Sequence, residues 1–153
     1  MGLLVGALGT TDLTGYTCYR VYMQTLDPTD FVTSVSGNIN TPLDVSTTTS
    51  FYHSPLGGVT AENVNPLLLP VYPDLGVDSW VTIGIDGPAD ATSGESAPSV
   101  VNSPGQNWAL QFDPGGGLPG GNIEINDEVG GVWYVLNGDA NGFPDADLSL
   151  IHI

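Results

Sequence analysis

Glycine and proline divide this chain into short segments, and this division limits its fold more than any other sequence feature. The 153 residues include 21 glycines and 12 prolines, which gather in runs such as 114–117 and 119–121. Glycine allows positive φ angles and proline fixes φ near its turn value, so such runs form turns and interrupt helices. We therefore expect short strands joined by turns.

Hydrophobic patterning between these turns is typical of strands. Most of the segments place apolar side chains at every second position, as a half-buried strand requires. Two others are short and β-branched, and the last is a continuous apolar run that indicates a buried strand. The predicted strands are 16–26, 31–35, 43–48, 80–85, 107–112, 123–125 and 132–136.

Helix signals are almost absent. The one helical candidate is 60–69, and Pro66 within it limits the helix to one or two turns. The polar segment 89–105 is expected to be a long surface loop. Many short strands with so little helix predict an all-β protein, a β-sandwich of jelly-roll or Greek-key type, formed by a single domain over residues 1–147.

The charge balance is strongly acidic. Asp and Glu number 17, Arg20 is the single cationic side chain, and the net charge is −16. Such a charge repels phosphate backbones and anionic lipid, so we exclude nucleic-acid and membrane-surface binding. It also repels itself, and salt or bound divalent cations would restore stability. Adaptation to salty water needs no ligand, and calcium loading is the alternative.

Cysteine usage and hydropathy bear on location. Cys18 is the only cysteine, so an intrachain disulfide is impossible. The sequence shows neither a cationic region followed by an apolar signal segment nor an apolar run of membrane-spanning length. We expect a secreted or cell-surface piece without its signal, and hence an extracellular location.

The last six residues, LSLIHI at 148–153, match the translation of a common transposase sequencing adapter. We expect them to be a non-native tail of a metagenomic fragment, although their alternation also fits a genuine final strand. Under the first interpretation His152 is not native, and His53 is the only native histidine.

Several short segments spread over nearly the whole chain carry a family resemblance: GTTDLTGY at 9–16, YRVY at 19–22, DFV at 30–32, PL at 42–43, NPLL at 65–68, DSWVTIG at 78–84, GVW at 131–133 and LNGDANG at 136–142. They resemble an uncharacterised secreted domain of marine bacteria, which belongs to large multidomain surface proteins. The resemblance implies a secreted β-sandwich module whose partners are other modules of its parent protein, and it implies no activity. Since relatives continue into another strand after 137–142, it also implies that this domain lacks its last strand and has an exposed edge.

One acidic segment, 139–147, has the composition of a calcium loop. Calcium takes six to eight oxygen ligands, which alternate Asp and Asn residues in a glycine-containing turn can supply. The opening of this segment resembles dockerin-type loops, but Phe143 stands where a third ligand belongs and Leu150 where a closing carboxylate belongs. A degenerate acidic turn is therefore expected, with calcium as a possible cofactor. The candidate ligands are Asp139, Asn141, Asp145 and Asp147.

Catalytic patterns are missing. A nucleophilic triad needs a base, and His53 has no Gly-x-Ser-x-Gly segment to serve. One histidine and one cysteine also cannot build a zinc site. The many acids leave a carboxylate pair conceivable, so a glycan-active enzyme is kept as a third interpretation. We predict that the chain is not an enzyme.

The aromatic residues give the remaining candidates. The three tryptophans lie in strand-like segments, where core packing is expected. Tyr52 and Tyr72 lie in loops and are the candidate ligand-binding residues, since exposed rings stack on sugars. The predicted function is a non-enzymatic structural or interaction module of a secreted or cell-surface multidomain protein, stabilised by salt or calcium. A carbohydrate-binding module that binds glycans is the alternative.

Overall fold

A computed structural model describes the backbone of residues 2–10, 13, 15–144 and 148–152, and the side chains of residues 13 and 15–144. The described elements are mostly short strands, every pairing between them is antiparallel, and one α-helix is present among them. The prediction of a β-rich protein is thus confirmed. No helix in the described part of the chain is long and apolar enough to span a membrane.

The first sheet contains β1 (Gly2–Thr10), β2 (Thr17–Gln24) and β8 (Leu148–His152) in the order β1-β2-β8. β2 is the strand predicted at 16–26, whereas β1 was not predicted. β8 pairs with β2 in regular register, from Gln24 opposite Leu148 to Arg20 opposite His152. The expected tail is thus paired as a strand, and its adapter origin stays a prediction.

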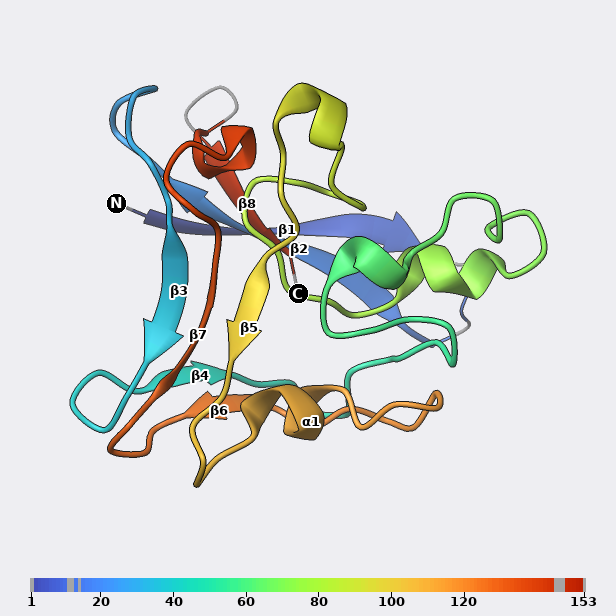
Figure 1. Ribbon diagram of the computed structural model, residues 1–153. Coiled ribbons are helices and arrows are strands. Elements are labelled where there is room, and N and C mark those ends of the chain that lie inside the picture. Colours follow the sequence, from blue (N-terminus) through green and yellow to red (C-terminus); the bar gives the residue numbers. More distant parts are fainter. Residues whose placement is uncertain (1, 11–12, 14, 145–147, 153) are drawn as a thin grey trace.

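The remaining strands form two smaller sheets (Figure 1). In one, β7 (Gly131–Tyr134) lies between β3 (Ser34–Gly37) and β5 (Ser99–Val101), and in the other β4 (Leu43–Val45) pairs with β6 (Ile123–Ile125). These strands confirm 123–125 and most of 132–136, and β4 shortens the predicted strand 43–48. The prediction of 31–35 was mostly wrong, because β3 shares only residues 34–35 with it and continues to Gly37.

Four short 3₁₀ helices lie between these strands in the described part of the chain: η1 (Ala61–Asn63), η2 (Pro73–Val77), η3 (Ala91–Ser93) and η4 (Ala140–Gly142). The candidate helix 60–69 is therefore limited to η1 and the turns that follow. The predicted loop 89–105 was partly wrong, because it contains η3 and the edge strand β5. The two adjacent β-branched residues of this segment, Val100 and Val101, are the signal that could have indicated β5.

The main core lies between all three sheets. Trp108 and Trp133 are fully buried at its centre, with ring centroids 5.3 Å apart, and Met23 from β2 packs against it. Each indole N–H donates to a backbone carbonyl, that of Trp108 to Val101 and that of Trp133 to Thr82. The expectation that the tryptophans are core residues is confirmed, since Trp80 is also buried.

A second, smaller core lies apart from the first. It consists of Ala61, Val64, Leu75 and Trp80, against which Leu68 and Leu69 are partly buried. These residues come from η1, η2 and the chain between them, so this small core supports the green lobe at the right of Figure 1.

The predicted strand at 107–112 is wrong, because this segment forms α1 (Trp108–Phe112). The Asn107 side chain accepts the backbone N–H of Leu110 at 3.0 Å and so caps the helix. Trp108 and Phe112 are four residues apart and share the buried face, while Leu110 is exposed. Large apolar residues at i and i+4 fit a helix as well as an alternating strand.

The predicted strand at 80–85 is also wrong. Its residues up to 83 are all buried, so both faces contact protein, and among the described residues a bridge from Val81 to Thr60 is its one ladder contact. Gly84 has a φ of +72°, and a Cβ at this position would overlap the backbone oxygen of Asn141. The chain therefore turns at Gly84, which a substitution to any L-residue would strain.

Candidate functional site

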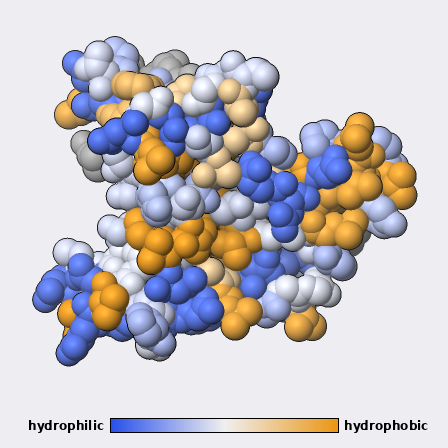
Figure 2. Space-filling model, in the orientation of Figure 1, coloured by the Kyte–Doolittle hydropathy of each residue, from blue (hydrophilic) through white to orange (hydrophobic). Residues whose placement is uncertain are grey.

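Large apolar side chains are exposed together on residues 65–73, which we call the apolar loop. Leu67 is 84% exposed, Val71 69% and Tyr72 46%. The loop sequence, NPLLLPVYP, contains no charged residue. Figure 2 shows the corresponding lobe as a largely hydrophobic projection at the right. Grouped apolar exposure of this kind marks interaction surfaces more than isolated exposed residues do.

The apolar loop has a fixed backbone. Three prolines restrict φ, and the amides of Val71 and Tyr72 both donate to the carbonyl of Leu68, at 2.9 and 2.8 Å. The Asn65 side chain accepts the backbone N–H of Leu67 at 3.0 Å, which fixes the entry to the loop. Because its backbone is already ordered, the loop would lose little conformational entropy on binding.

Its side chains divide between two directions. Leu68 and Leu69 pack on the small core, whereas Leu67, Val71 and Tyr72 face outward. The inward leucines attach the loop to the protein and the outward residues form its contact face. Inward and outward side chains follow no regular period along this apolar run, so the sequence does not reveal which of its residues are exposed.

The base of the apolar loop is held by carboxylates in and after η2. Asp74 accepts the Tyr52 hydroxyl at 2.8 Å and the Ser54 hydroxyl at 3.3 Å. Asp78 is fully buried and accepts the backbone N–H groups of Ser54 at 2.7 Å and of Gly58 at 3.2 Å. Charge-assisted bonds of this kind are stronger than neutral ones.

His53 lies beside this anchor, between two carboxylates. Its Nδ1 is 3.7 Å from Asp78 Oδ1 and 3.9 Å from Asp113 Oδ1, and neither ring nitrogen has a hydrogen-bond partner within the described residues. Its ring contacts Phe112 edge-on at 4.9 Å. The side chain has no exposed surface, so a substrate could not reach it without local opening. No sequence spacing indicated this cluster, because its members come from three distant segments.

The two candidate tyrosines differ. Tyr72 is exposed, whereas Tyr52 binds Asp74 through its hydroxyl and meets Tyr16 edge-on at 5.6 Å. Burial, and then the hydrogen bond to Asp74, raises the pKa of Tyr52 to about 12. Tyr52 therefore supports the base of the apolar loop, and only Tyr72 of the pair presents its ring on the loop itself.

The predicted calcium ligands fall into two groups. Asp139 accepts the Ser96 hydroxyl at 3.0 Å and the Leu136 backbone N–H at 2.7 Å. Asn141 is buried, accepts the Ser96 N–H at 3.1 Å and donates to the carbonyls of Ile83 and Ser96. Both therefore hold neighbouring segments together. The other two candidates, Asp145 and Asp147, lie outside the described residues.

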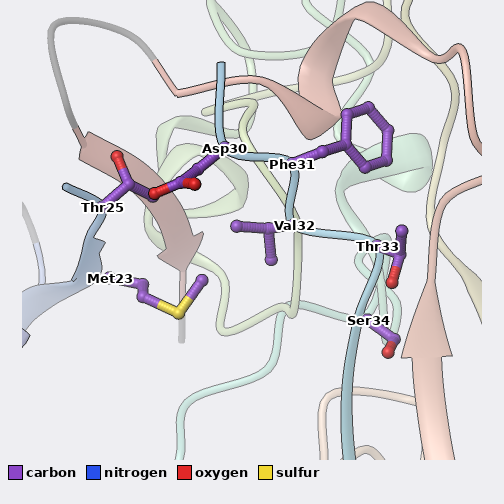
Figure 3. Close-up of a pocket in the computed structure, with 7 residues that line it drawn as sticks. All are labelled: Met23, Thr25, Asp30, Phe31, Val32, Thr33 and Ser34. Carbon is purple, nitrogen blue, oxygen red and sulfur yellow. The ribbon is translucent and has the colours of Figure 1, made fainter. Parts of the chain in front are cut away.

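No group of three metal-binding side chains lies close enough together to hold a metal ion within the described part of the chain. A hollow of about 400 Å³ does lie between the end of β2 and the start of β3 (Figure 3). The Asp30 carboxylate, its single charged group, already accepts the backbone N–H of Leu26 and of Asp27. Its lining residues are Met23, Thr25, Asp30, Phe31, Val32, Thr33 and Ser34.

Comparison with known proteins adds no relative. No protein-family model matches the chain, and no curated protein or solved structure matches it.

Proposed function

We propose that this chain is a non-enzymatic interaction module that binds a partner through the apolar loop. The observation that carries the proposal is the exposure of Leu67, Val71 and Tyr72 on one ordered, uncharged loop. We also propose that the module belongs to a secreted or cell-surface multidomain protein and that its sheets form a β-sandwich of jelly-roll or Greek-key type. Contributions of all three sheets to one core support this finer fold.

Charge indicates which partner fits. The protein has a net charge of −16, so a second copy would meet strong repulsion at moderate salt. A partner with an apolar groove bordered by Lys or Arg would be attracted by the acidic surface and would cover the outward side chains. We therefore propose a partner protein whose binding surface is apolar at its centre and basic at its rim.

The alternative functions have weaker support. A carbohydrate-binding module would use several exposed rings side by side, but of the two candidate tyrosines Tyr52 has its hydroxyl bound to Asp74 and only Tyr72 is exposed on the apolar loop. A glycan-active enzyme would need two accessible carboxylates that face each other in a cleft, whereas Asp30 is the one carboxylate among the described residues that line the hollow between β2 and β3. Protein binding needs neither feature.

The test uses a helical peptide with leucine on one face and lysine on the other, and a second peptide with serine in place of leucine. The variant Leu67→Ser/Val71→Ser removes the contact face without changing charge. A matched control exists elsewhere on the surface, because Leu26 is 85% and Val129 73% exposed. The control variant is therefore Leu26→Ser/Val129→Ser. Binding is measured by calorimetry at physiological salt.

We expect the wild type and the control variant to bind the leucine–lysine peptide equally, and the loop variant to bind at least about tenfold more weakly, since each buried aliphatic side chain stabilises a contact by about 1.5–3 kcal/mol. The serine–lysine peptide should bind all three proteins weakly and alike. Equal affinity of the three proteins for the leucine peptide would contradict the proposal, because attraction would then come from charge alone.

Stabilisation by salt or calcium is part of the same proposal. Screening of the acidic surface should raise the melting temperature as sodium chloride is added. Calcium should raise it further than sodium does at matched ionic strength if carboxylates bind the ion directly. If thermal unfolding gives equal shifts of the melting temperature for the two salts, calcium acts only by screening charge.

A further inference from the structure

The sequence contains two Asn-Gly dipeptides, at 137–138 and 141–142. In such a dipeptide the glycine nitrogen can attack the asparagine side-chain carbonyl, because glycine has no Cβ to hinder the approach. The reaction needs a free side chain and a free glycine nitrogen. The structure gives these two dipeptides opposite environments, although they lie in one short segment.

Asn137 meets both conditions. It lies with Gly138 in an exposed turn, and Gly138 has a φ of +108°. Among the described residues, neither the Asn137 side chain nor the Gly138 nitrogen forms a hydrogen bond. The turn is closed around them instead, by the Asp139 N–H bond to the Leu136 carbonyl at 3.1 Å.

Asn141 meets neither condition. Its side chain is buried and makes three hydrogen bonds, to Ile83 and twice to Ser96. The Gly142 nitrogen donates to the Asp139 carbonyl at 3.1 Å. The ring of Phe31 also fills the space beside the Gly142 Cα, so a Cβ there would overlap it. Attack at Asn141 would therefore require local unfolding.

We propose that Asn137 is a site of spontaneous deamidation and that Asn141 is protected by the fold. The Gly138 nitrogen forms a bond to Cγ of Asn137 and loses its proton, and the side-chain amide leaves as ammonia. Water then opens the resulting succinimide at either carbonyl, which gives aspartate or isoaspartate. Both products add a negative charge beside Asp139, and isoaspartate also lengthens the main chain inside the turn.

The test compares the two dipeptides within one molecule. The folded protein is incubated in mildly alkaline buffer, and peptide mapping by mass spectrometry, with isoaspartate-specific methylation, follows each site with time. A parallel sample is incubated in concentrated urea. The variant Asn137→Gln is the control, because glutamine cannot close the five-membered ring in this way.

In the folded protein we expect Asn137 to react at least about tenfold faster than Asn141, since Asn141 must first lose its hydrogen bonds. In urea the two sites should react at similar rates. Asn137→Gln should abolish isoaspartate formation at position 137 in folded protein. Equal rates at the two sites of folded protein, or a faster Asn141, would overturn the proposal.

Discussion

Two loops of this molecule distribute polar and apolar side chains in opposite ways. The apolar loop, residues 65–73, exposes Leu67 and Val71, whereas residues 136–142, which we call the polar loop, bury Asn141. Neither loop follows the usual partition between a hydrophobic inside and a polar surface. The comparison shows that a side chain in these loops is buried when neighbouring segments depend on it, whatever its polarity.

The polar loop holds two neighbouring segments. The Asn141 side chain hydrogen-bonds to the carbonyl of Ile83, which lies in an irregular buried segment outside the strands, and also to the N–H and C=O of Ser96. A buried amide can replace a missing strand in this way, because buried backbone groups need partners. The apolar loop satisfies its own backbone through turns, so its outward side chains are available for contact.

Removing the Asn141 amide should have the largest effect on stability. Asn141→Leu would leave the buried carbonyl of Ile83 and the partly buried N–H and C=O of Ser96 without these partners. We expect a loss of about 3 kcal/mol or more in the free energy of unfolding. Asn137→Leu, in the exposed part of the same loop, should change it by less than about 1 kcal/mol. Urea unfolding measures both variants, and similar losses would contradict the role assigned to Asn141.

Removing the anchor of the apolar loop should have the next largest effect. Asp78→Ala leaves the backbone N–H groups of Ser54 and Gly58 unpaired, and we expect a loss of about 2–3 kcal/mol. Hydrogen exchange should also quicken at the amides of Val71 and Tyr72 if the anchor orders the loop. Asp78→Asn, which retains one acceptor oxygen, should lose less. Unchanged hydrogen exchange in Asp78→Ala would show that Asp78 does not order the apolar loop.

Tyr52 should have a smaller, pH-dependent effect. The folded protein retains its phenolic proton up to a pKa of about 12, above the ordinary value of about 10 in an unfolded chain. Folding therefore favours the protonated form, so this contribution is fully present below about pH 10 and is lost as the pH rises through 12. Tyr52→Phe should be less stable than the wild type by about 1 kcal/mol near neutral pH. Its stability should fall less than that of the wild type as the pH rises, because it has no phenol to ionise. Tyrosinate absorbance and unfolding curves measure both.

The outward side chains of the apolar loop should have the smallest effect on stability. Leu67→Ser/Val71→Ser removes side chains that contact mainly solvent, so the free energy of unfolding should change by about 0.5 kcal/mol or less. Chemical denaturation checks this value. A large loss would show that Leu67 and Val71 pack within the molecule and would remove the main difference between the two loops.

The sequence predicted the strand content better than the arrangement of the strands. The alternating segments 16–26 and 123–125 form β2 and β6. Ile123 and Ile125 of β6 are buried in the main core, and Met23 of β2 packs against it. At 107–112 the same pattern formed a helix, since Trp108 and Phe112 share a face in either geometry. The apolar segment 80–85 is surrounded by protein, and the spacing of its apolar residues could not indicate burial on all sides.

The candidate sites depended on contacts between distant residues. Asp139 and Asn141 were chosen for their oxygens, but the positions of their partners, Ser96 and Ile83, are decided by the fold. His53 was set aside because the sequence offers no Gly-x-Ser-x-Gly segment for it to serve, and its two carboxylate neighbours lie far along the chain. Exposure of the apolar loop was equally hidden, because its sequence resembles a core segment.

Because Arg20 is the single cationic side chain of the sequence, this molecule allows a simple protease assay. Arg20 lies in β2 between β1 and β8, with its guanidinium 3.3 Å from Asp86, and it is the only Lys or Arg residue of the chain. Trypsin therefore has a single bond to cleave, within the central strand of a sheet. The rate of that one cut measures how often the sheet opens, without interference from loops elsewhere.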